Sequence, residues 1–305
     1  MDYKKILKSR ALRLGILRML SFIPDKAMIK LQYKIKCGRK LNLKNPQRYT
    51  EKLQWYKLYH RDPIMIQCVD KYDVREYIKG KGMESLLTTC YGVYDSVEDI
   101  DFEKLPSQFV MKDTLGGGGN SVIVVQDKTK LNIVEAKKQM QSWVKENTRV
   151  RSGGREWPYY NGKKHRIIIE EYLCQPDGDL ADFKFYCFDG KVACFYIRSG
   201  YSGNHNDGKM TFFSREKECL KDVGLDYCRQ TDIQPTLPAE IDEMIKLAEQ
   251  IATGFPHVRA DFYNVLGKVY FGEMTFFSAS GYFMFTPDEF DYELGKKFVL
   301  PEVKK

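Results

Sequence analysis

The sequence lacks several patterns by which a function is usually recognised. Its 305 residues include eight cysteines, but no C-x-x-C pair and no histidine at the spacing of a zinc site. No segment approaches the ~20 consecutive apolar residues that a membrane-spanning helix needs. There is also no clear signal-peptide core with a cleavage site and no low-complexity tract. We therefore expect a cytoplasmic, globular protein with reduced thiols.

The common nucleotide-binding motifs are absent as well. Four consecutive glycines, 116–119, follow the apolar stretch FVMKDT and lead into SVIVV, which reads as a strand. A Walker loop and a Rossmann fingerprint must each open a helix, whose N-terminus supplies the anion site. A protein-kinase flap lies between strands, but its lysine follows the loop, and the HRD and DFG motifs are missing here. Two interpretations remain: a flexible turn, or a glycine flap that folds over phosphates which Lys112 neutralises.

Positive charge is concentrated at the N-terminal end. The net charge is +8, yet residues 1–50 contain 14 Lys or Arg against two Asp, a balance of +12, so the other residues sum to −4. Apolar residues recur at helical spacing among the basic ones over 4–20, which predicts an amphipathic basic helix. This distribution argues against a general nucleic-acid binder. It favours one local anionic partner, such as a membrane surface, or else a solvated helix face.

The order of predicted elements is mixed α+β rather than a series of βαβ units. Residues 1–95 are mostly helical and include a helix that starts near Asp70 and ends in the glycines at 80 and 82. Asp189-Gly190 is a strong hairpin signal between two strands. The predicted strands are 108–114, 121–127, 166–173, 182–188, 191–197, 258–265 and 268–277, with helices at 132–148 and 239–253.

Two acids near the C-terminus indicate a metal site. Asp261 and Glu273 lie on strands that should form one hairpin, and Mg²⁺ takes a few carboxylates plus the phosphates of its nucleotide. Isolated strand carboxylates are more often surface residues, but both acids have phenylalanine neighbours, among which an unpaired charge would be costly. Arg259 is two residues before Asp261, on the same strand face. It is expected to pair with Asp261 or to hold a substrate anion.

Taken in order, these features resemble the ATP-grasp superfamily, and more closely the TupA-like ATP-grasp proteins of surface-polysaccharide gene clusters. The matching stretches, which cover most of residues 40–300, are NPQRYTEKLQWYKLYHRDP, CVDKYDVREYI, FVMKDTLGGGG, REWPY, IIIEEYL, DFKFYCFDGK and VRADFYNVLGKVYFGEMTF. The resemblance implies an ATP-grasp fold, in which two α/β lobes clasp ATP after a mainly helical N-terminal segment. It divides the chain into an N-terminal lobe at 1–95, a small lobe with the flap at 96–165 and a large lobe at 166–305.

The resemblance also implies roles for residues around the nucleotide. Lys112 would bind its phosphates beneath the flap of Gly116, Gly117, Gly118 and Gly119. Adenine would be bound by Glu170 or Glu171 and by the backbone of Tyr172 and Leu173. Asp182 would contact the ribose, and Lys184 would contact a phosphate. Without the resemblance, an ordinary buried strand at 167–173, with surface charges at Asp182 and Lys184, is an equally good interpretation. The Mg²⁺ ligands would be Asp261, Glu273 and Thr275, the last standing where the superfamily's E-x-N motif has an asparagine.

The implied activity is that of an ATP-dependent carboxylate–amine ligase, which makes an acyl phosphate that an amine then displaces. The acid would be a uronic acid of a surface-polysaccharide precursor, and the flap would keep water from the acyl phosphate. Two further residues have two interpretations each. Arg198 is either a residue that closes a hairpin or part of the substrate pocket, and His205 is either a loop histidine or part of that pocket. The candidate residues for the substrate pocket are Arg259, Lys184, Arg198, His205, Ser278, Ser280 and Gly281.

Three alternatives stay open from the sequence. A phosphotransferase on the same fold would phosphorylate a sugar hydroxyl and need no amine. A glycosyltransferase would prefer a nucleotide sugar and often carries a D-x-D motif, which occurs here at 99–101 and 177–179 in turn-like stretches. A non-catalytic module would bind ATP as a ligand, although the combination of lysine, flap and paired acids argues against it.

Overall fold

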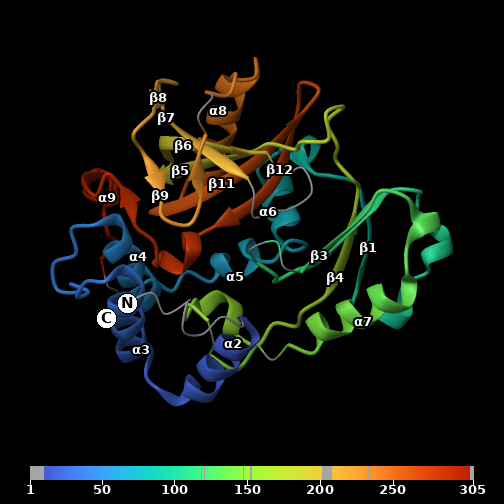
Figure 1. Cartoon of the computed structure of the whole chain (residues 1–305), viewed down its shortest axis with the longest axis horizontal. Coiled ribbons are helices and arrows are strands. Elements are labelled where there is room, and N and C mark those ends of the chain that lie inside the picture. Colours follow the sequence, from blue (N-terminus) through green and yellow to red (C-terminus); the bar gives the residue numbers. More distant parts are fainter. Residues whose placement is uncertain are drawn as a thin grey trace.

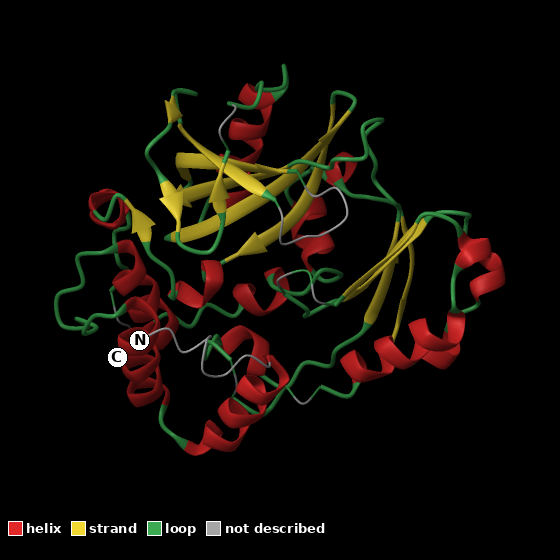
Figure 2. Cartoon of the chain, in the orientation of Figure 1, coloured by secondary structure: helices red, strands yellow, loops and turns green. Residues whose placement is uncertain are grey.

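Two large β-sheets, a short two-stranded sheet (β13-β9) and the helices around them make up the described part of the chain (Figures 1 and 2). The computed structural model describes residues 10–117, 119, 121–146, 148–151, 153–200, 208–231 and 234–302. In Figure 1 the larger sheet lies at the top, the smaller one at the right, and the N-terminal helices α2 and α3 at the bottom. This mixed helix-and-sheet arrangement agrees with the predicted α+β class.

The smaller sheet is four-stranded and antiparallel, in the order β1-β4-β2-β3. Its strands are β1 (Cys90–Tyr94), β2 (Phe109–Asp113), β3 (Val122–Val125) and β4 (Ile167–Glu170). Phe109 and Met111 of β2 are fully buried in one cluster with Met140 and Trp143 of α7 (Ile133–Val144). Because side chains alternate along a strand, Lys112 points to the opposite face, away from α7.

The larger sheet has the order β10-β7-β6-β5-β11-β12, with β8 beside β7. Its strands are β5 (Asp182–Phe188), β6 (Lys191–Ser199), β7 (Lys209–Ser214), β8 (Cys219–Leu220), β10 (Arg229–Gln230), β11 (His257–Val265) and β12 (Lys268–Thr275). The β5–β6 turn has φ of 47° at Asp189 and 70° at Gly190, the two positive values that a tight hairpin turn requires. Helix α8 (Ile241–Ala252) packs against β5, β6 and β11.

The N-terminal helices are α2 (Arg10–Met19), α3 (Asp25–Cys37), α4 (Tyr49–Tyr59), α5 (Ile64–Cys68) and α6 (Val74–Gly80), and α9 (Glu289–Lys297) lies near the C-terminal end. Helix α6 lies between the sheets: the Tyr77 hydroxyl donates to the Ile251 carbonyl of α8 over 2.8 Å, and Arg75 bonds Glu170 of β4. The short remaining elements are η1 (Leu20–Phe22), η2 (Glu84–Leu86), η3 (Val97–Asp99), η4 (Phe102–Lys104), η5 (Lys128–Lys130), η6 (Trp157–Tyr160), η7 (Ser278–Gly281), β9 (Gly224–Leu225) and β13 (Phe285–Thr286).

Each predicted strand and helix coincides with a strand or helix of the structure, but β4 ends at Glu170 rather than at 173, and α7 ends at Val144 rather than at 148. One helix start is corrected as well. The helix expected from near Asp70 begins at Val74 instead. The Asp70 carboxylate accepts the backbone N–H groups of Tyr72 and Asp73 over 2.9 and 3.0 Å, so the preceding residues form turns.

All eight cysteines are free. Among the described helices, none has the length and apolarity to cross a bilayer.

The predicted division of the chain at residues 96 and 166 stays a prediction. The four-stranded sheet extends past both limits, because β4, which ends at Glu170, lies between β2 and β1, which begins at Cys90. Residues 4–9 of the predicted basic helix lie outside the described residues, and α2 accounts for the stretch from Arg10 to Met19.

A candidate active site between the two sheets

The larger sheet brings the predicted ligand residues into rows across its strands. Lys184 of β5 is opposite Asp261 of β11, which in turn is opposite Glu273 of β12. In the neighbouring row, Arg259 is opposite Thr275. Directly opposed residues share one face of a sheet, with Cβ atoms about 5 Å apart. The antiparallel register therefore gathers these five side chains on a single surface.

A buried charge cluster is centred on Asp261, which is 1% exposed. Its Oδ1 accepts Arg259 Nε over 2.7 Å, and its Oδ2 accepts Arg259 Nη2 over 2.6 Å and Lys184 Nζ over 2.7 Å. Of the two roles predicted for Arg259, pairing with Asp261 is thus observed, and holding a substrate anion stays a prediction. Burial lowers the pKa of Arg259, but the Asp261 charge outweighs it and holds that pKa well above its ordinary value. Asp182 adds a second carboxylate, 3.0 Å from Lys184 Nζ.

Glu273 is the more accessible of the two acids predicted as metal ligands, with 42% of its side chain exposed. Its Oε1 is 3.5 Å from Arg259 Nη2 and accepts the Thr275 hydroxyl over 3.3 Å. Burial raises the pKa of Glu273, but the charges of Lys71, Lys184 and Arg259 outweigh it and hold the pKa below its ordinary value. Glu273 is therefore an ionised, outward-facing carboxylate, which a cation can reach.

Thr275, the departure from the superfamily's E-x-N motif, links its two neighbours. Its hydroxyl accepts Arg259 Nη2 over 3.1 Å and donates to Glu273. Gly272, just before Glu273, is the extra residue of a β-bulge between Asp261 and Phe262, and a Cβ on it would be 3.0 Å from the Asp261 carbonyl oxygen. Bulges re-aim side chains. Here the bulge places Glu273 opposite Asp261.

On the smaller sheet, Lys112 is held by Glu170. Lys112 Nζ is 3.0 Å from Glu170 Oε2, while Oε1 accepts the Thr88 hydroxyl over 2.8 Å and lies 3.2 Å from Arg75 Nη1. Burial raises the pKa of Glu170, but Lys112, Thr88 and Arg75 outweigh it, so the pKa lies below its ordinary value. The ionised carboxylate positions the ammonium group of Lys112.

The predicted adenine-binding stretch continues from β4 towards the larger sheet. The Glu171 carboxylate accepts the Thr89 N–H over 3.1 Å, and the Tyr172 hydroxyl accepts Gln126 Nε2 over 2.7 Å. Leu173 is half-buried. The side chains of Glu170 and Glu171 are thus both used within the protein, and their role towards adenine stays a prediction, as does that of the backbone at 172–173.

The described flap residues lie against a lysine that the sequence analysis did not single out. Lys71 Nζ donates to the Gly116 carbonyl, and the Lys71 N–H donates to the Thr114 carbonyl over 2.8 Å. The same ammonium group is close enough to lower the pKa of Glu273. Lys71 therefore interacts with the flap through a hydrogen bond and with the acidic row through its charge. Gly117 and Gly119 are described as well, whereas Gly118 lies outside the described residues.

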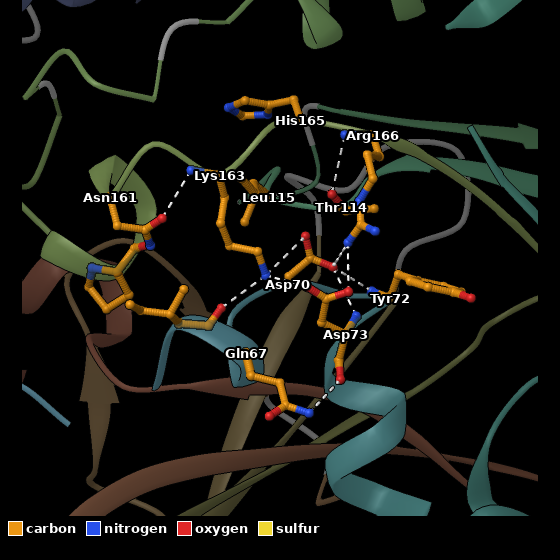
Figure 3. Close-up of polar contacts among 12 residues, drawn as sticks. Gln67, Asp70, Tyr72, Asp73, Thr114, Leu115, Asn161, Lys163, His165 and Arg166 are labelled. Atoms are coloured by element: carbon orange, nitrogen blue, oxygen red, sulfur yellow. Dashed lines mark hydrogen bonds and ion pairs between the residues drawn. The ribbon is translucent and has the colours of Figure 1, made fainter. Parts of the chain in front are cut away.

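A polar cluster beneath the flap was also missed from the sequence (Figure 3). Arg166 Nη2 is 3.0 Å from Asp70 Oδ1 and 2.7 Å from Asp73 Oδ1, and Lys163 pairs with Asp73. His165 Nδ1 is 2.8 Å from Asp113 at the end of β2. The stretch CVDKYDVREYI contains Asp70, Lys71, Asp73 and Arg75, and its density of charges was the available signal. These contacts fix the base of the flap.

Three of the candidate substrate-pocket residues, Ser278, Ser280 and Gly281, lie in η7, directly after β12. Arg259 Nη1 donates to the Ser278 hydroxyl over 3.3 Å, which ties this loop to the charge cluster. The Ser280 carbonyl accepts Gln54 Nε2 over 3.0 Å and Lys57 Nζ over 2.7 Å, and its hydroxyl bonds Glu156. Gln54 also donates to the Gly281 carbonyl over 2.8 Å. The loop is thus anchored from below by α4.

Of the two other residues predicted for the substrate pocket, the structure describes only one. Arg198 of β6 is opposite Asp182, so it borders the same surface as Lys184. His205 lies outside the described residues. The roles of both towards a substrate stay predictions.

Comparisons with known proteins give one family and several similar structures. A family model described as TupA-like ATPgrasp matches residues 51–299. The sequence matches none of the curated proteins with which we compared it.

The similar solved structures include three ligases. D-alanine–D-alanine ligase from Bacillus anthracis is 19% identical, with a TM-score of 0.40, covering 68% of this chain and 57% of that one. D-alanine–D-alanine ligase from Helicobacter pylori is 15% identical, with a TM-score of 0.44 and coverages of 84% and 70%. L-amino acid ligase from Bacillus licheniformis is 13% identical, with a TM-score of 0.44 and coverages of 85% and 55%. The chain therefore spans little more than half of the first and third.

Proposed function

Because the chain belongs to the TupA-like ATP-grasp family, we propose that it is an ATP- and Mg²⁺-dependent ligase that joins a carboxylate to an amine. One observation carries the proposal. The strand register places Lys184, Asp261 and Glu273 in one row across the larger sheet, and Lys71 bonds the Gly116 carbonyl of the glycine flap. A lysine, a flap and paired acids around one space are what the binding of a magnesium–nucleotide complex needs.

The donor set fits Mg²⁺. Asp261, Glu273 and Thr275 offer only oxygen, which is the ligand that Mg²⁺ prefers, and one or two carboxylates suffice when phosphates complete the coordination. Glu273 faces outward, whereas both oxygens of Asp261 are engaged by Arg259 and Lys184. In the described part of the chain, no three His, Cys, Asp or Glu side chains are arranged to hold a metal by themselves. We propose that Glu273 is the principal ligand and Asp261 the second.

When bound, Mg-ATP supplies the phosphoryl group that turns a carboxylate into an acyl phosphate. The chain itself binds and orients the substrates and excludes water from them. Lys112 and Lys184 would neutralise phosphate oxygens, and Lys71 would hold the flap through the Gly116 carbonyl. The Arg259 guanidinium, 3.3 Å from Ser278 and next to Glu273, is placed to orient the acid substrate near the phosphates.

The finer parts of the function belong to the same proposal. The acid would be a uronic acid of a surface-polysaccharide precursor, the amine an amino acid or another small amine, and the location cytoplasmic. The anchored loop η7 is the element that we assign to the amine and acid substrates. These parts are supported by the resemblance to TupA-like proteins and by the position of η7 after β12.

A product assay tests the proposal. The purified protein is incubated with Mg-ATP and pairs drawn from panels of uronic acids and amines, and ADP and free phosphate are measured separately. We expect equal amounts of ADP and phosphate, formed only when both an acid and an amine are present. ADP without free phosphate would identify a phosphotransferase, and turnover of a UDP-sugar without ATP a glycosyltransferase, and either result would contradict the ligase.

A further inference from the structure

An exposed face of the N-terminal helices is both apolar and basic. Thirteen large apolar side chains are exposed in the described part of the chain, and five of them lie in α2, η1 or α3. Met19 is 78% and Phe22 75% exposed, at the turn between α2 and α3, and Leu31 and Ile35 of α3 are 48% and 46% exposed. Single exposed apolar residues are ordinary, but such a concentration indicates an interaction surface.

The geometry of α3 sorts its residues into a buried and an exposed side. Tyr33, among the buried residues, bonds the Thr50 hydroxyl of α4 over 2.9 Å, and the full buried set is Met28, Ile29, Gln32, Tyr33 and Cys37. On the exposed side, Lys26, Lys30 and Lys34 form one row at a spacing of four residues, beside Leu31 and Ile35. We call Lys26, Lys30, Leu31, Lys34 and Ile35, with Met19 and Phe22, the α3 face.

The N-terminal segment that carries this face is strongly basic, although Arg18 pairs with Glu146, and Arg39 and Arg48 pair with Asp288. Residues 10–48 contain eleven Lys or Arg and a single acid, Asp25. Asp25 is already bonded to Arg155 over 3.1 Å and to the Tyr160 hydroxyl over 2.7 Å. In Figure 1, α2 and α3 lie at the edge of the molecule opposite the seven-stranded sheet. A partner bound to the α3 face would therefore not block the space between the sheets.

We propose that the α3 face docks on an anionic lipid surface. The lysines meet phosphate headgroups, while Phe22, Met19, Leu31 and Ile35 enter the boundary between headgroups and acyl chains, as in helices that lie in the membrane plane. Long lysine side chains suit this arrangement because their methylene groups lie along apolar surface while the ammonium group stays in water. The sequence pattern predicts a membrane contact on the helix at 4–20. The exposed residues of the α3 face favour α3 and the turn before it instead.

Binding to vesicles tests the charge of the face. The full-length protein is mixed with vesicles of phosphatidylglycerol and phosphatidylethanolamine, or of phosphatidylcholine alone, and the bound fraction is measured by flotation. We expect binding only to the anionic vesicles, weakened by added salt. Lys26→Glu/Lys30→Glu/Lys34→Glu should lower the partition coefficient about 100-fold or more, since each lysine near an anionic surface strengthens binding about fivefold.

A matched variant controls for net charge. Lys104, Lys130 and Lys191 have 85%, 84% and 77% of their side chains exposed, and none of them lies on the α3 face. Lys104→Glu/Lys130→Glu/Lys191→Glu should bind within about twofold of the unchanged protein, because screening limits the effect of distant charges. Absence of binding to anionic vesicles, or an equal loss in both triple variants, would overturn the proposal.

A second pair of variants tests the apolar half of the face. Phe22→Ser/Leu31→Ser should weaken binding to anionic vesicles about tenfold or more, while circular dichroism stays unchanged. Unchanged vesicle binding in this variant would mean that the face attracts polyanions in general and would refute membrane insertion. A dimer in sedimentation that Phe22→Ser/Leu31→Ser dissociates would assign the face to a second copy of the chain instead.

Discussion

Arg259 joins three parts of the candidate site through one guanidinium group. It bonds both oxygens of Asp261, the Thr275 hydroxyl and the Ser278 hydroxyl of η7. Removing one partner of a buried pair leaves the other charge without compensation, which is far more costly than the pair itself is stabilising. The position of this arginine therefore matters for folding as well as for chemistry.

Arg259→Leu should lower the free energy of unfolding by about 3–5 kcal/mol, because Asp261 would keep only Lys184 as a partner. Arg259→Lys should cost less, since it keeps the charge and loses only the bidentate geometry. Urea denaturation of both variants measures the difference. An Arg259→Leu protein as stable as the unchanged one would show that the cluster does not depend on this arginine.

Lys112→Ala should reduce turnover about 10²-fold or more, the scale of one lost preorganised donor to a phosphate. The fold should persist, because Glu170 would keep Thr88 and Arg75 as partners. The assay is phosphate release with the substrate pair found in the product screen, with Lys191→Ala on the exposed end of β6 as the control. Full turnover by Lys112→Ala would remove this lysine from the site.

At this scale the sequence predicted contacts within a strand better than contacts between elements. Arg259 and Asp261 were expected to pair because a strand repeats every two residues. The partners of Lys112 could not be read in the same way. Glu170 approaches Lys112 only because β4 inserts between β1 and β2, and Arg75 reaches Glu170 because α6 lies between the sheets.

At the scale of elements, His257 links β11 to β5 and α4. Its ring is 0% exposed, with Nδ1 2.8 Å from the Cys187 carbonyl oxygen and Nε2 2.8 Å from the Tyr49 hydroxyl. Since a carbonyl only accepts, Nδ1 donates and Nε2 accepts from Tyr49. Burial lowers the pKa of His257 to about 3, so the neutral ring is the folded form.

Acidification should therefore weaken the fold through His257. Its folded pKa of about 3 lies below the ordinary value of 6.5, so the unfolded chain takes up the proton first as the pH falls below 6.5. Between about pH 7.5 and about pH 5, the unfolding free energy should fall by about 2 kcal/mol more in the unchanged protein than in His257→Gln. Urea denaturation at both pH values measures this, and equal pH dependence of the two proteins would contradict it.

Element boundaries were predictable where local chemistry decided them. Asp189-Gly190 and Leu266-Gly267 both turn with positive φ, and the strands on either side of each turn pair in register. The start of α6 was not predictable in this way. Asp70 looks like the first residue of a helix, but its carboxylate is shared with Arg166, which is distant in the sequence and fixes the turns before Val74.

At the scale of the whole molecule, residues 70–75 hold the parts of the site together. Asp70 and Asp73 bond Arg166 next to β4, Lys71 bonds the flap, and Arg75 bonds Glu170. The helical N-terminal segment is thus part of the candidate site rather than only a lobe in front of it. Any ligand that closes the flap has to act through this segment, so its binding should be visible in the stability of the whole chain.

Thermal unfolding of the purified protein with Mg-ATP, with Mg²⁺ alone and with Mg²⁺ plus UDP-sugars is the most direct test of the nucleotide site. At about 100 times its Kd, a ligand adds about 2.7 kcal/mol to the stability of the folded state. We predict that only Mg-ATP raises the unfolding temperature and that Glu273→Gln reduces this shift. Stabilisation by a UDP-sugar and not by Mg-ATP would contradict the account.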